Sequence, residues 1–194
     1  MKKIALMVLA LFLLAACEVS PSATQSGEGA VAGDEGQSLI VYFSRSGNTA
    51  AVAQEIQAQT DAAIFEIVPV EPYSDDYDTV VEVAQGEQRV QARPEIRDRV
   101  ENWDEVETVY IGYPIWWGDM PMILYTFFDS YDFSGKTIRP FCTSGGSGLS
   151  NTDRTIAGLE PEATVYSGLH IGDSQLEDAA ADVEAWLAAV ETVQ

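Results

Sequence analysis

"VETVYIGYPIWWGDMP", residues 106–121, joins the pattern of a buried strand to an unusual loop. Its first half, residues 106–113, is a nearly continuous apolar run, as expected of a strand covered on both faces in a parallel sheet. Pro114 ends the run, and Trp116 and Trp117 follow side by side. Neighbouring residues point in different directions on a helix or a strand, so both tryptophans cannot lie on one buried face. The pair therefore needs an explanation beyond ordinary packing.

Short apolar runs alternate with helical patterns on both sides of this strand. We expect strands at residues 39–43, 63–68, 106–113, 137–143 and 163–171. We expect helices at residues 48–60, 122–131 and 150–159, and helix and loop over residues 76–100 with a break at Arg93-Pro94. A last helix is expected to open with a capping box at Ser174–Glu177. The apolar stripe expected on that helix is Leu176, Ala180, Val183, Leu187 and Val190. This order predicts an α/β fold with a parallel sheet covered on both faces, which binds ligands beyond the carboxyl ends of its strands.

The loop after the first strand, SRSGNTA at residues 44–50, suits a phosphate group. Ser44, Ser46 and Thr49 supply hydroxyls, Asn48 supplies an amide, and the free N–H groups of the next helix face the loop. The loop is neither GxxxxGK[ST] nor GxGxxG, so a P-loop nucleotidase and a Rossmann dinucleotide site lose support. The alternative is that the same residues simply cap the helix.

The loop after the fourth strand, TSGGSG at residues 143–148, contains adjacent glycines. Glycine permits positive φ and lets backbone amides approach a ligand closely. Taken alone, the loop is a flexible turn before a helix; beside the other two loops, it favours a ligand site.

Three segments together resemble the flavodoxin-like family: VYFSRSGNTA (41–50), IGYPIWWGDMP (111–121) and GKTIRPFCTSGGSGLS (135–150). The resemblance covers residues 38–194 and implies a flavodoxin-like three-layer sandwich, with a five-stranded parallel sheet in the order 2-1-3-4-5 and one non-covalent FMN. The residues that it assigns to FMN binding are Ser44, Arg45, Ser46, Gly47, Asn48, Thr49 and Ala50 around the phosphate, Pro114, Ile115, Trp116, Trp117 and Gly118 along the isoalloxazine, and Thr143, Ser144, Gly145, Gly146 and Ser147 at the pyrimidine edge.

Within these loops we expect Trp116 beside the flavin and Trp117 at its rim or on the surface. The alternative places one tryptophan in the core and the other on a surface. The Arg45 side chain is expected to point outward, and Asp119 to cap the third helix. No residue is expected to act as acid, base or nucleophile.

The N-terminus carries a targeting pattern. Two lysines and a short apolar stretch in residues 1–16 are typical of a signal peptide, and LAAC at residues 14–17 resembles a bacterial lipobox. The resemblance implies lipidation of Cys17 and a location outside the cytoplasmic membrane, anchored by the lipid alone. The alternative is an ordinary signal peptide with an incidental cysteine. Residues 17–37 lack leucine, isoleucine and aromatics and predict a flexible tether, which leaves residues 38–194 as one domain.

Charge restricts the partners. The formal net charge is −21, and it becomes about −23 once the two N-terminal lysines are removed. Nucleic acid and anionic lipid would be repelled, whereas a redox protein with a basic docking face would be attracted. The acidic run EPYSDDYD, residues 71–78, is either a solvated helix start or a docking edge for such a partner. The alternative is that the acids serve solubility alone. We expect a monomer.

Three further features are assigned ordinary roles. Cys142 lies in an apolar run and is expected to pack as a small hydrophobe. His170 is the only histidine and lacks companions at ligand spacing, so no metal is expected. Gly135-Lys136-Thr137 resembles part of a Walker motif but precedes a strand, and it is interpreted as a turn.

The resemblance and the sequence patterns together leave three candidate functions. The first is a tethered, FMN-binding electron carrier. The second is an FMN-dependent NAD(P)H oxidoreductase with a quinone-type acceptor, for which the insertion at residues 71–101 would build a second site. The third is a cofactor-free lipoprotein that binds other proteins on the same fold.

Overall fold

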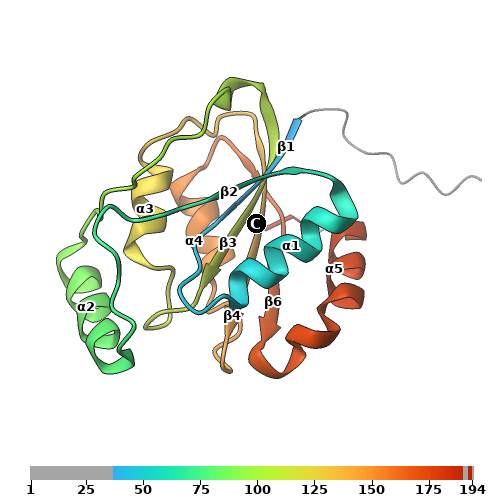
Figure 1. Ribbon diagram of the computed structural model, residues 1–194. Coiled ribbons are helices and arrows are strands. Elements are labelled where there is room, and N and C mark those ends of the chain that lie inside the picture. Colours follow the sequence, from blue (N-terminus) through green and yellow to red (C-terminus); the bar gives the residue numbers. More distant parts are fainter. Residues whose placement is uncertain (1–36, 190–191, 194) are drawn as a thin grey trace, which may run out of the picture. The chain divides into compact units, whose positions relative to one another are not determined.

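The computed structural model describes residues 37–189 and 192–193 (Figure 1). The predicted signal peptide, Cys17, Val190 and the tether up to residue 36 lie outside the described residues. A membrane-spanning helix is absent from the described part of the chain, where each helix is too short or too polar to cross a bilayer.

The sheet is parallel throughout and has the predicted order. Its strands are β1 (Gln37–Tyr42), β2 (Ala63–Glu66), β3 (Val106–Pro114), β4 (Thr137–Ser144), β5 (Thr164–Val165) and β6 (Leu169–Gly172). They follow the order β2-β1-β3-β4-β5, and β6 also pairs with β4. The prediction of a parallel α/β sheet in the order 2-1-3-4-5 is confirmed.

The fifth position of the sheet differs from the prediction of one strand at 163–171. Ile138 pairs with Val165 and Phe141 with Leu169, so two residues of β4 lie opposite three residues of the partner. Pro140 lies at this mismatch, and proline has no N–H to donate to the ladder. The strand is therefore interrupted into β5 and β6.

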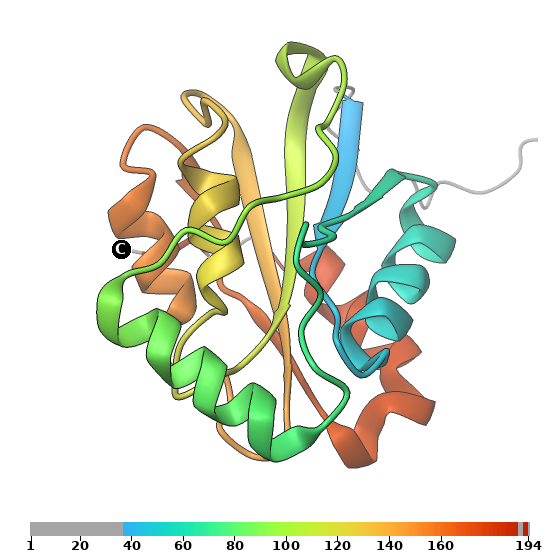
Figure 2. The same cartoon turned by 60° about the vertical axis from the view of Figure 1, so that its left-hand side comes forward.

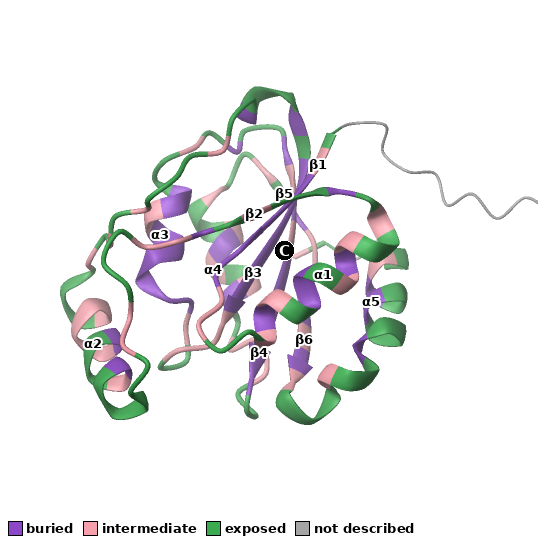
Figure 3. Ribbon diagram, viewed as in Figure 1, coloured by how far each residue is buried: buried purple, intermediate pink, exposed green. Residues whose placement is uncertain are grey.

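Helices cover both faces of the sheet (Figures 1 and 2). They are α1 (Asn48–Thr60), α2 (Tyr77–Val90), α3 (Met122–Phe128), α4 (Thr152–Leu159) and α5 (Ala179–Ala188), with 3-10 turns η1 (Trp103–Glu105) and η2 (Asp173–Asp178). Alternate residues of β1 enter two core clusters, one with α3 and α4 and the other with α1 and α5. Figure 3 shows the resulting buried strands between half-exposed helices.

Two helices depart from the predicted pattern at their ends. α3 ends at Phe128 instead of residue 131, and the last helical segment opens as the 3-10 turn η2 without the predicted cap at Ser174. There the Gln175 side chain accepts a hydrogen bond from the Gly172 N–H instead. The buried face of α5 is Ala179, Val183 and Trp186, while Ala180 is exposed. The predicted stripe was thus partly wrong, because the 3-10 turn shifts the face that meets the sheet.

Cys142 is fully buried in β4, and burial raises the pKa of its thiol to about 12. This confirms the prediction that it packs as a small hydrophobe.

Candidate functional site: three loops at the carboxyl edge

The first loop leaves the start of α1 open. Gly47 is the N-cap residue with φ +90°, and no side chain caps the helix. The helical ladder begins with the Ala51 N–H, which donates to the Gly47 carbonyl, so the N–H groups of Asn48, Thr49 and Ala50 precede it. The loop side chains therefore do not cap the helix, and the alternative interpretation of this loop was wrong.

Ser44 Oγ is buried and has no hydrogen-bond partner among the described residues. A buried hydroxyl without a partner is unfavourable, and such a group calls for an explanation. It lies in the loop that leads into the uncapped helix start, where an anion would accept hydrogen bonds from both. The residues present thus fit a phosphate group.

The three loops are joined directly to one another. Thr49 Oγ1 and Thr143 Oγ1 are 2.8 Å apart and both residues are buried, which links the first loop to the third. The Ile115 N–H donates to the Thr143 carbonyl at 3.0 Å, which links the second loop to the third. Asn48 donates its side-chain amide to Asp173. The predicted site residues therefore converge at one edge, but the side chains of Thr49, Thr143 and Asn48 act as braces between loops.

The third loop is organised around Ser144, which is 8% exposed. Its hydroxyl lies 2.8 Å from His170 Nε2 and accepts the Ser147 N–H at 3.1 Å. Gly146 has φ +148°, a conformation that favours glycine, and its N–H also points at Ser144 Oγ. The sequence pattern did not identify His170 as part of this site, because β6 comes into register with β4 only in the folded sheet.

The paired tryptophans occupy different environments. Trp116 is half-buried and packs edge-to-face on Phe43 and Tyr73, with ring centroids 5.5 and 5.1 Å apart. Trp117 is 52% exposed, and its indole N–H donates to the Val81 carbonyl of α2 at 3.0 Å. The Trp116 ring therefore belongs to an aromatic cluster with Phe43 and Tyr73, and the Trp117 ring lies at the surface.

Trp117 also has a strained backbone. Trp116 and Asp119 exchange two backbone hydrogen bonds around a two-residue turn, in which Trp117 has φ +53° and Gly118 has φ +77°. Turns with positive φ at both central positions favour asparagine, aspartate or glycine. A bulky residue in this conformation is an outlier of the kind found at ligand sites.

Asp119 does not cap α3 as predicted. The N-cap residue is Pro121, and Asp119 instead accepts the Met120 N–H at 2.7 Å and the Tyr125 hydroxyl at 2.8 Å. Burial, and then the hydrogen bond to Asp119, raise the pKa of Tyr125. Asp119 thus fixes the end of the second loop against α3.

The segment after β2 contacts the first and second loops, which the sequence pattern did not indicate. Arg45 points out of the first loop, as predicted, and donates to the carbonyls of Ser74 at 3.0 Å and Asp75 at 2.6 Å. Tyr73 packs on Trp116, and α2 accepts the Trp117 N–H. Residues 73–81 therefore border the site.

This edge defines the class of protein. A parallel sheet in the order 2-1-3-4-5, with an open helix start, an aromatic loop and a glycine-rich loop at its carboxyl edge, is the doubly wound flavodoxin-like architecture. The family model described as Flavodoxin matches residues 37–190, and the chain belongs to the flavodoxin family.

Solved structures support the assignment. A candidate flavoprotein from Bacteroides eggerthii is 30% identical with a TM-score of 0.69, covering 78% of this chain and 96% of that one. A second, from Bacteroides uniformis, is 31% identical with a TM-score of 0.68, covering 79% and 99%. A flavoprotein from Lactobacillus acidophilus in complex with FMN shares the fold at 22% identity and a TM-score of 0.61, covering 74% and 97%. Among curated proteins, none matches.

Proposed function

We propose that this flavodoxin-family protein binds FMN non-covalently at the three-loop edge and carries electrons. The observation that carries the proposal is the buried, unpartnered hydroxyl of Ser44 in the loop that leads to the uncapped start of α1. The FMN-bound flavoprotein with the same fold supports the choice of ligand. Bound FMN would supply the redox chemistry, while the protein supplies binding, orientation and exclusion of water.

The phosphate would be held without a side-chain cation. The Arg45 guanidinium is engaged by the carbonyls of Ser74 and Asp75, so the hydroxyls of Ser44 and Ser46 and the open N–H groups of α1 remain as donors. Backbone amides at a helix N-terminus bind phosphate in this way, aided by the helix dipole.

The flat ring would be covered by Trp117. From the sequence we expect Trp116 beside the flavin, but its ring already packs on Phe43 and Tyr73. Trp117 is exposed, which supports it as the ring that stacks on the flavin. An indole held on a strained turn offers a rigid face for offset stacking. Ser144, fixed by His170, would hold the third loop against the other end of the ring.

The cellular setting belongs to the same proposal. The lipobox-like LAAC and the net charge of −21 support a carrier tethered outside the cytoplasmic membrane through Cys17, acting with a basic redox partner. The same charge disfavours NADH or NADPH as a direct reductant, since both are anionic.

The test uses the full chain with Cys17→Ala, which prevents lipidation. We expect it to take up one FMN, visible as flavin absorption that remains after gel filtration, and to show no NADH or NADPH oxidation. A colourless protein that takes up no FMN would overturn the proposal. Steady turnover of NADH or NADPH would instead assign the protein as an FMN-dependent oxidoreductase.

A further inference from the structure

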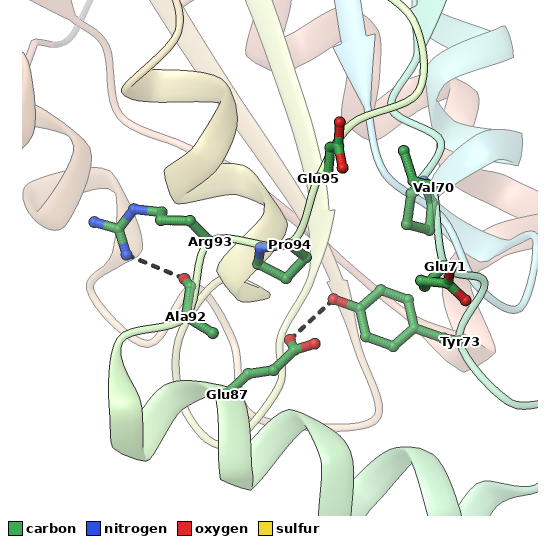
Figure 4. Close-up of a pocket in the computed structure, with 9 residues that line it drawn as sticks. Val70, Glu71, Tyr73, Glu87, Ala92, Arg93, Pro94 and Glu95 are labelled. Atoms are coloured by element: carbon green, nitrogen blue, oxygen red, sulfur yellow. Dashed lines mark hydrogen bonds between the residues drawn. The ribbon is translucent and has the colours of Figure 1, made fainter.

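A cavity of about 390 Å³ lies outside the three loops (Figure 4). It is lined by Pro69, Val70, Glu71 and Tyr73 after β2, by Glu87 of α2 and by residues 92–95. Its two connecting segments are paired, since the Val70 N–H donates to the Glu95 carbonyl at 2.8 Å and Pro69 forms an antiparallel bridge with Ile96. The cavity is thus part of the fold and falls within the usual size range of ligand pockets, about 300–1,000 Å³.

The walls of this cavity are apolar and its polar groups are acidic. The apolar residues are Pro69, Val70, Tyr73, Ala92 and Pro94, and the carboxylates are Glu71, Glu87 and Glu95. Figure 4 shows Glu87 and the Tyr73 hydroxyl facing each other, joined by a hydrogen bond of 2.9 Å. Desolvation raises the pKa of Glu87, which the bond from Tyr73 partly offsets. This carboxylate would gain from a cationic partner.

The basic residue of the lining does not neutralise these acids. Arg93 turns away from Tyr73 and Glu87, as Figure 4 shows, and binds the Asp129 carboxylate and the carbonyls of Gln91 and Ala92. Its guanidinium also lies over the Tyr125 ring. The cavity therefore presents negative charge on apolar walls, with its own cation engaged elsewhere.

The chemistry of this lining selects an organic cation. Within the described residues, no three acidic, histidine or cysteine side chains are grouped closely enough to hold a metal ion. Lysine and arginine combine an apolar stem with a charged head, which matches apolar walls with carboxylates among them. The net charge of −21 would steer a basic protein towards this surface.

We propose that the cavity receives one lysine or arginine side chain of the basic protein that exchanges electrons with this carrier. The inference rests on the proposed function for the identity of the partner. Tyr73 forms a wall of the cavity and packs on Trp116 of the second loop at 5.1 Å between ring centroids. A side chain docked here therefore anchors the partner next to the predicted flavin edge.

The test is a titration followed by backbone NMR, with the full-length Cys17→Ala protein loaded with FMN. The probes are acetyl-Ala-Arg-Ala-amide, the same peptide with lysine, the neutral glutamine peptide, and n-butylammonium chloride. We expect the two basic peptides to shift the amides of residues 70–73 and 87–95, and the glutamine peptide to shift none of them. The Glu87→Gln, Glu95→Gln double variant should bind about tenfold more weakly.

The matched control removes the same number of charges elsewhere. Glu82 is exposed on α2, and Glu184 is exposed on α5. Neither lines the cavity. We expect the Glu82→Gln, Glu184→Gln variant to weaken the peptides less than twofold. Equal weakening by both double variants would reduce the effect to general charge steering and overturn the proposal.

Two other results would also overturn it. Shifts outside the cavity residues would place the peptides elsewhere, and n-butylammonium binding as tightly as the peptides would make this a site for small amines. Flavin absorption of the same sample separates this inference from the proposed function. If the protein takes up no FMN, the proposed electron-carrier function is overturned. If FMN binds but the peptides shift no amides, only the proposed docking cavity is overturned.

Discussion

The amino and carboxyl edges of the central sheet differ in whether their polar groups find hydrogen-bond partners within the chain. At the amino edge, Trp103 is 8% exposed and its indole N–H donates to the Asp132 carbonyl at 2.7 Å. Lys136 is buried beside it, its ammonium donating to the carbonyls of Trp103 and Val106 while lying over the Trp103 ring. The Trp103 indole and the Lys136 ammonium are thus matched by acceptors from the chain itself.

The carboxyl edge leaves its donors open. Ser44 Oγ lacks a partner, α1 lacks a side-chain cap, and Trp117 is exposed on a strained turn. The difference teaches how to tell structural from ligand-binding polar groups. Serine, glycine and tryptophan occur at both edges, and the hydrogen-bond partners of their polar groups distinguish the two edges.

The largest expected effect is a loss of stability from a substitution at the amino edge. Trp103→Ala should lower the free energy of unfolding by about 3–5 kcal/mol, because it empties a packed site between Phe127, Tyr131 and Phe133. Chemical denaturation measures the loss. The FMN affinity of the remaining folded protein should stay unchanged. A weakened affinity without loss of stability would contradict the division between the edges.

The next effect separates the paired tryptophans. Trp117→Ala should weaken FMN binding roughly 10- to 100-fold, as expected for loss of a stacked ring worth about 1–3 kcal/mol, with little change in apoprotein stability. Trp116→Ala should instead destabilise the apoprotein by roughly 1–3 kcal/mol, because Phe43 and Tyr73 lose their packing partner. Fluorescence titration and denaturation give the two values. Equal, negligible FMN losses would return both rings to structural roles.

A smaller effect concerns the open hydroxyl. Ser44→Ala should weaken FMN roughly tenfold, since one hydrogen bond to a charged group is worth about 1.5 kcal/mol or more. Apoprotein stability should be unchanged or slightly higher, because the hydroxyl has no partner to lose. The control is Ser134→Ala at the amino edge, where the hydroxyl donates to Glu162. Unchanged FMN affinity in Ser44→Ala would remove this residue from the phosphate site.

The smallest effect depends on pH. Burial, and then the charges of Asp132 and Asp129, raise the pKa of Glu160 to about 7 from an ordinary value of 4.5. The folded protein therefore holds this proton more tightly than the unfolded chain, and the stability it contributes below pH 4.5 is lost as pH rises through 7. Glu160→Gln should raise the melting temperature at pH 8 by about 1–3 °C and leave it unchanged at pH 4. Equal shifts at both pH values would exclude this cause.

Sequence patterns predicted a parallel α/β sheet and the three loops, because apolar periodicity and glycine placement are local signals. The strand order was implied by the family resemblance. The sequence patterns missed the division of the fifth strand, although Pro140 was visible, since the consequence appears only in the register of β4 with β5 and β6. They also assigned Asp119 to a helix cap, whereas the carboxylate accepts hydrogen bonds from the Tyr125 hydroxyl and the Met120 N–H. Local rules do not include partners that arrive from elsewhere in the fold.

The chain's own residues determined that a polar, glycine-containing edge would form, and that two adjacent tryptophans could not share one face. Tertiary structure alone decided which tryptophan is the more buried, because Phe43 and Tyr73 reach Trp116 from distant parts of the sequence. It also decided that His170 fixes Ser144 and that Arg45 is engaged by the segment after β2. These contacts join residues far apart along the chain, so their energies enter only when the sheet and its loops are assembled.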